Sequence, residues 1–221
     1  MKKITVLLLA LCMQTFGYSQ KEKVEQQSYS VPPNKEVSLN LKFAQEIKVE
    51  STSAAELGLK TILTYRQEKD LKIHQLKVEN DGGQLQITAD MNTDYLKSQG
   101  ENTCWDCEER DCLCFKVAFV VMVPKGVKVN LETISGNIEI PQLKNAIQAK
   151  SISGFIDVGL DPSAKKELVF KSVTGEIYTD FDLQLDENST PFSKKLNAPL
   201  NGGGELVALE TISGDIFFRK K

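Results

Sequence analysis

The chain has 221 residues, and its 27 lysines and arginines nearly balance its 30 aspartates and glutamates, giving a net charge of −3. No block of like charge stands out, which argues against nucleic acid or an anionic membrane surface as a partner. A chain of this length can bury a substantial core as a single domain.

The N-terminus has the pattern of a secretory signal peptide. Lys2 and Lys3 precede a short apolar run, Ile4–Cys12, and small residues at Gly17 and Ser19 suit cleavage after Ser19. The apolar run is too short to span a bilayer. We therefore expect an exported protein with no membrane span after cleavage, located in the periplasm, at the outer envelope or outside the cell. The expected organisation is a signal peptide at 1–19, an N-terminal extension at 20–30 and a β-strand-repeat domain at 31–221.

The next part of the chain is typical of β-strands. Apolar and polar residues alternate over Glu36–Lys42 and Leu57–Tyr65, and Asp81-Gly82 indicates a hairpin turn within Val78–Ile87. Phe115–Val123 is almost wholly apolar, as expected of a strand buried on both faces. No segment shows a convincing helical stripe, so the fold class is predicted to be all-β.

A cysteine-rich loop, expected at 96–115, contains Cys104, Cys107, Cys112 and Cys114. In an exported protein such a cluster favours two disulfides. A nested pairing of Cys104 with Cys114 and Cys107 with Cys112 suits a loop tip. Two alternatives stay open: the four thiolates hold a zinc or other soft metal ion, or they are free, redox-active thiols.

Four copies of one short motif dominate the second half of the chain, and each follows a strand-like run. Their glycines are spaced by 18, 21 and 39 residues, and the last interval is the sum of the first two. A period near twenty predicts a β-solenoid, or β-helix-like stack, of ~20-residue rungs that is clearest over 127–221. On this hypothesis 181–204 holds one degenerate rung and a loop. The copies are Thr133–Ile138, Ser151–Ile156, Ser172–Ile177 and Thr211–Ile216.

The apolar residues change parity inside every copy, between the first hydroxyl residue and the β-branched residue after it. Because side chains alternate faces along a strand, this change predicts a corner at that point. The hydroxyls of Thr133, Ser151, Ser172 and Thr211 are expected to lie inside. Glycine is expected where the backbone needs room or a positive φ; these structural glycines are Gly136, Gly154, Gly175 and Gly214.

Positions that face outward after each glycine vary, so they are the candidates for specificity. Phe155, Tyr178 and Phe217 are candidate anchors for a partner protein or glycan. Glu139 and Asp157 align in one column, which leaves open a carbohydrate-active enzyme on a β-helix. The one histidine, His74, is expected to be an exposed strand residue, and no catalytic residue is assigned.

Two segments resemble a known family. Val123–Val129 leading into Leu131–Ile138, and Asn201–Gly204 followed by Leu206–Phe217, resemble the secreted bacterial β-strand-repeat family labelled putative adhesin, in its Bacteroidetes-type version. The resemblance implies a right-handed β-solenoid-like domain in the cell envelope, without catalytic residues or cofactor. We accordingly expect a non-enzymatic structural or adhesin-like module; a thiol-based metal-binding or redox protein is the alternative, and an enzyme is the third interpretation.

Overall fold

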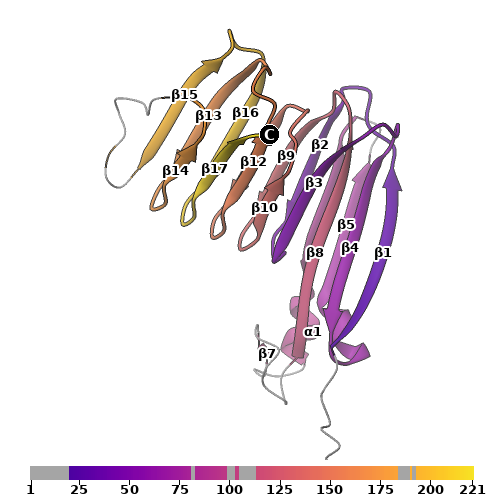
Figure 1. The fold of residues 1–221 in the computed structure, drawn as a ribbon. Helices are drawn as coiled ribbons and strands as arrows, with labels where there is room; N and C mark the ends of the chain where they lie inside the picture. The colour runs from indigo at the N-terminus through magenta and orange to yellow at the C-terminus, as the bar shows by residue number, and fades with distance from the viewer. Residues whose placement is uncertain (1–19, 81–82, 99–102, 105–112, 184–189, 191–192) are drawn as a thin grey trace, which may run out of the picture.

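The computed structural model describes residues 20–80, 83–98, 103–104, 113–183, 190 and 193–221, and these form an all-β fold of two mixed sheets that do not close on each other (Figure 1). The first sheet, here sheet A, has its strands in this spatial order: β1 Lys21–Tyr29, β4 Leu57–Tyr65, β8 Leu113–Pro124, β3 Glu46–Thr52, β10 Asn137–Ile140, β12 Ile156–Leu160, β17 Ile216–Lys220 and β14 Ile177–Thr179, with β7 Thr103–Cys104 paired to β8. The order of the second sheet, sheet B, is β15 Lys194–Leu200, β13 Lys166–Ser172, β16 Glu205–Thr211, β11 Ile147–Ser151, β9 Lys128–Thr133, β2 Glu36–Leu41, β6 Leu85–Met91 and β5 His74–Asn80.

Each motif copy carries the chain from sheet B to sheet A, so one copy makes one two-strand rung. Neighbouring rungs pair in parallel and in register: Val37, Val129, Ile147, Val207 and Leu168 form one continuous inward row. All five side chains are fully buried, and together with the inward residues of sheet A they form the core. The β2–β3 pair is a fifth rung of the same design, with a divergent corner sequence.

The rungs do not stack in chain order. β16 lies between β11 and β13, and β17 lies between β12 and β14, so the fourth copy is inserted between the second and the third. The degenerate rung predicted for 181–204 is wrong in the part of that segment that is described. There β15 instead runs antiparallel to β13 and forms the edge of sheet B. This return strand carries the chain back, and β16 then fills the space beside β13.

At the corners, the hydroxyl residues face inward as expected, but the residue that follows each of them does not. Thr133, Ser151, Ser172 and Thr211 are buried, as predicted. Ile152 and Ile212, which were expected to share the inward parity, are 41% and 38% exposed. The change of parity is therefore spread over the two residues after the hydroxyl, because the backbone turns there before it enters sheet A.

Three of the corner hydroxyls donate to backbone carbonyls of the adjoining rung, whereas Thr211 Oγ1 donates to Gly214 O of its own corner. Ser151 Oγ donates to Gly136 O at 3.1 Å, and Ser172 Oγ donates to Gly214 O at 3.1 Å. The glycines also stack directly on one another: a Cβ on Gly154 would lie 2.3 Å from Gly136 O. Glycine is therefore needed at these positions because the rungs lie too close together for a Cβ, and not because the backbone has a positive φ.

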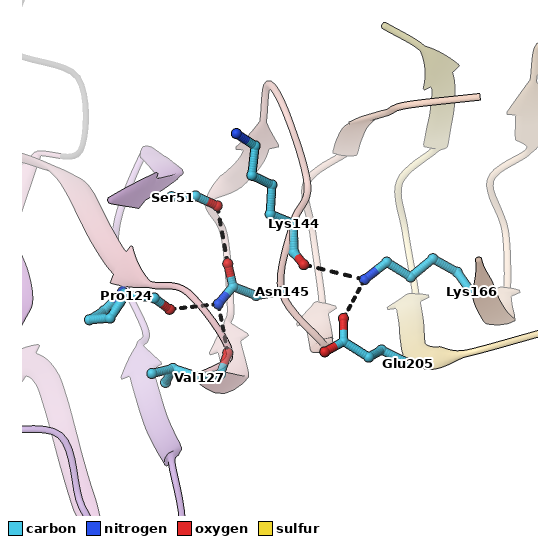
Figure 2. Close-up of polar contacts among 7 residues, drawn as sticks. All are labelled: Ser51, Pro124, Val127, Lys144, Asn145, Lys166 and Glu205. Carbon is cyan, nitrogen blue, oxygen red and sulfur yellow. Dashed lines mark hydrogen bonds and ion pairs between the residues drawn. The ribbon is translucent and has the colours of Figure 1, made fainter. Parts of the chain in front are cut away.

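Asparagine and lysine side chains tie the rungs together at the other end of the strands (Figure 2). Asn145 is buried, and its Nδ2 donates to Pro124 O at 2.7 Å and to Val127 O at 3.0 Å. Ser51 Oγ donates to Asn145 Oδ1. Because buried backbone carbonyls need hydrogen-bond partners, Asn145 compensates two carbonyls of the turn between β8 and β9.

The N-terminal part of the chain extends both sheets with antiparallel strands. The segment expected to be an extension forms β1, which pairs along its whole length with β4. The predicted hairpin is confirmed as β5 and β6, although its turn at 81–82 lies outside the described residues. Two short helical segments, η1 Glu68–Ile73 and α1 Thr93–Ser98, lie at this end of the molecule.

Candidate binding surface

The three aromatic residues singled out in the sequence meet on the outer face of sheet A. In the strand register, Phe217 on β17 lies between Asp157 on β12 and Tyr178 on β14. The rings of Tyr178 and Phe217 are stacked, with centroids 5.2 Å apart and planes at 10°. Phe155 meets Phe217 edge-on at 6.1 Å. We call these three residues the aromatic ladder.

The aromatic ladder is partly open to solvent. Tyr178 is 51% exposed and lies on β14, the edge strand of sheet A, so one face of its ring is not covered by Phe217. Arg219 lies 5.1 Å from the Phe217 ring centroid and also forms an ion pair with Asp157 at 3.2 Å. The guanidinium thus connects the rings to the neighbouring carboxylate, an arrangement that combines apolar contact with charge.

Acidic and basic residues continue this row away from the rings. Glu139 lies beside Asp157 and next to Lys48 across β10 and β3, so the carboxylate column expected from the sequence is present. Lys48 forms an ion pair with Glu50, and this hydrogen bond and charge raise the pKa of Lys48. Asp157, the neighbour of Glu139 in this column, is held in the ion pair with Arg219.

The cysteine cluster falls largely outside the described residues. Cys107 and Cys112 are not described, and for Cys104 and Cys114 only the backbone is. There β7 pairs with β8 in parallel, with the Cα of Cys104 opposite that of Cys114. Among the described residues, no group of three or more histidine, cysteine, aspartate or glutamate side chains is arranged to hold a metal ion.

His74 is not the exposed strand residue expected from the sequence. Its side chain faces the other sheet, with its ring 5.9 Å from that of Phe115 and 6.0 Å from that of Phe119. Burial lowers the pKa of His74, and the nearby charge of Glu25 acts in the opposite direction. The imidazole therefore serves as a neutral packing group.

A hollow on the outer face of sheet B was missed by sequence reasoning. It has a volume of about 520 Å³ and crosses five adjacent strands. The candidate residues named from the sequence are outward positions after each glycine, whereas this hollow is formed by outward positions before the corner. The signal was present as an alternation of charge at equivalent positions: Glu132, Lys150, Glu210 and Lys171.

Helices that could cross a membrane were sought within the described ranges, and none of them is long and apolar enough. No family model matches the chain, and no curated protein matches it.

The chain is similar in fold to solved structures of other bacterial proteins. A putative cell adhesion protein from Clostridium sporogenes has 13% sequence identity and a TM-score of 0.52, over 92% of this chain and 100% of that chain. A putative adhesin from Bacteroides fragilis has 10% identity and a TM-score of 0.25, over 90% and 97% of the two chains. Another from Parabacteroides distasonis has 11% identity and a TM-score of 0.29, over 91% and 97%. The similarity to the Clostridium protein supports the resemblance found in the sequence at the level of the fold.

Proposed function

We propose that this chain is an exported, non-enzymatic module of the cell envelope, with a solenoid-like stack of rungs, that acts by binding a partner, as an adhesin does. The observation that carries the proposal is the partly exposed aromatic ladder, in which Tyr178 is exposed and the two phenylalanines are half-buried. Phe155, Phe217 and Tyr178 lie on the outer face of sheet A and add nothing to the core between the sheets. Aromatic side chains grouped on a surface provide large contact areas for proteins and glycans.

Retention of the purified chain on envelope fragments of the producing cells tests this function. We expect the double variant Tyr178→Ala/Phe217→Ala to lose about tenfold in affinity, the size of a modest interface hot spot. Val24→Ala, which shortens another exposed apolar side chain on the distant strand β1, is the matched control and should bind normally. Equal retention of all three proteins would count against a binding role for the ladder.

The signal peptide at 1–19 and the disulfides are parts of the same proposal. Export into an oxidising compartment favours disulfides over free thiols. The parallel register of β7 and β8 places the Cα of Cys104 opposite that of Cys114, which supports a bridge between these two cysteines; Cys107 and Cys112 lie outside the described residues. Non-reduced peptide maps of the exported protein should begin at Gln20 and contain peptides linking Cys104 to Cys114 and Cys107 to Cys112. A tightly held metal ion with four free thiols would favour the metal-binding alternative instead.

A further inference from the structure

The hollow on the outer face of sheet B has the form of a ligand groove. It crosses β2, β9, β11, β16 and β13, which lie side by side in parallel register. One row across its middle consists of Ser38, Asn130, Gln148, Ala208 and Val169. The groove is hollow because Ser38 and Ala208 are short, whereas the next row along the strands carries long charged side chains. We call this hollow the sheet B groove.

The charges of the sheet B groove cancel. Glu132, Lys150, Glu210 and Lys171 follow one another across four neighbouring strands, with alternating sign. Lys171 Nζ lies 3.1 Å from Glu210 Oε1. A row with no net charge offers little attraction to a polyanion or a polycation, so it favours a neutral ligand. Val169, which is 40% exposed, is the one large apolar side chain of the lining that is exposed, so a lipid or an apolar peptide would bury little surface there.

The middle of the groove offers amide groups instead. Asn130 Nδ2 donates to Glu36 Oε1 at 2.7 Å, and this bond together with Lys128 lowers the pKa of Glu36. Asn130 Oδ1 is enclosed and accepts no hydrogen bond from the described residues. A buried acceptor without a donor is costly, so a rotation of the Asn130 side chain that brings this oxygen to the groove surface lets a ligand hydroxyl donate to it without breaking an existing bond to that oxygen. Gln148 lies on the next strand and supplies a second amide.

The spacing of these groups suits an extended chain of repeating units. Neighbouring strands are ~4.8 Å apart, so the five strands span about 19 Å. One strand spacing is close to the length that a single pyranose adds to an extended polysaccharide. The hydroxyl of Ser38 and the amides of Asn130 and Gln148 lie on three successive strands, so they can meet the hydroxyls of successive sugars.

From these observations we propose that the sheet B groove binds a linear, neutral oligosaccharide lying across the strands. The proposal rests on the proposed function only in treating the chain as a binding module, because the groove and the aromatic ladder lie on opposite sheets. Sugar hydroxyls bind the side chains of Asn130 and Gln148, and the exposed methyl groups of Val169 contact an apolar face of a sugar ring.

Calorimetric titration of the full exported chain with neutral tetrasaccharides of glucose, mannose, xylose and N-acetylglucosamine tests the proposal. We expect at least one to bind, and Gln148→Ala to weaken that binding about fivefold to tenfold, the value of a hydrogen bond or two. Ala208→Phe, which fills the hollow and removes no polar group, should abolish binding while the circular dichroism spectrum stays unchanged.

Tyr178→Ala separates this proposal from the proposed function. It should leave oligosaccharide binding intact even where it reduces retention on envelopes, because Tyr178 is on sheet A. Absence of binding to all four sugars, binding that Gln148→Ala and Ala208→Phe leave unchanged, or a preference for charged oligosaccharides or peptides would each overturn the assignment of the groove.

Discussion

Glycine is required at the corners by contact between backbones. A Cβ on Gly214 would lie 2.2 Å from Gly154 O, which belongs to the backbone of the next rung and cannot rotate away. We expect Gly214→Ala to lower the free energy of unfolding by about 2–3 kcal/mol, as overpacking of a core does. Ser153→Ala, at an exposed position in a corner of the same type, should change it little. Urea denaturation measures both variants, and equal midpoints would show that the rungs can move apart at no cost.

His74 makes stability depend on pH. Its pKa is lowered by burial, so the unfolded chain, with a histidine pKa near ~6.5, binds the proton more readily than the folded chain. The stability that comes from the neutral ring is present above that value and is lost as the pH falls below it. Urea midpoints between about pH 7.5 and 5.5 should therefore fall in the native protein and fall less in His74→Leu. A native midpoint that rises on acidification would contradict the assignment.

The strand pair β13–β16 contains an ion pair whose two ends lie in different surroundings. The Lys166 side chain is 6% exposed and that of Glu205 is 53% exposed, with Nζ and Oε2 2.6 Å apart (Figure 2). Replacing Lys166 leaves the Glu205 carboxylate in water, whereas replacing Glu205 leaves the buried Lys166 ammonium without its partner. We expect Lys166→Met to be close to neutral and Glu205→Ala to cost about 1–3 kcal/mol, by thermal unfolding. The reverse ranking would mean that Lys166 stabilises this strand pair chiefly through its other contact, the hydrogen bond from its Nζ to Lys144 O.

At the scale of secondary-structure elements, the strands were predictable because the alternation of apolar and polar residues that indicates a strand is local in the sequence. Leu57–Tyr65 was expected with the bounds that β4 has, and the buried corner hydroxyls follow from the same alternation. The positions of Ile152 and Ile212 could not be derived, because parity counting places a corner at one bond and this corner occupies two residues. The sheet B groove was missed for another reason: it depends on which side chains are short on neighbouring strands, so register must be known first.

At the scale of the molecule, stacking order is the feature that the repeat could not supply. An interval of 39 residues suggested a missing rung, yet the chain returns by an antiparallel strand and inserts its last copy into the stack. The similarity between the copies does not reveal this order, because every copy offers its neighbours the same hydrogen-bonding edge. The resulting stack has wide outer faces, and such faces suit the binding role proposed above.

Cysteine pairs at the corners test this order. Ser213 N donates to Ile152 O, which places Ser213 beside Ser153, whereas Thr174 lies one rung further away. At ~4.8 Å per strand, residues 153 and 213 are within disulfide reach and 153 and 174 are not. Mild oxidation should link Ser153→Cys/Ser213→Cys readily and Ser153→Cys/Thr174→Cys poorly, as read by peptide mapping. Efficient linking of the second pair alone would restore stacking in chain order.

The proposed function requires the outer faces of this stack to bind partners in the envelope. Site-specific photo-crosslinking in intact producing cells tests it most directly, with the photoreactive residue at Tyr178, at Gln148 or at Val24. We expect discrete adducts from Tyr178 and Gln148, different from each other, and none from Val24 on the far edge of sheet A. Adducts of equal yield and identity from all three positions, or from Val24 alone, would contradict it.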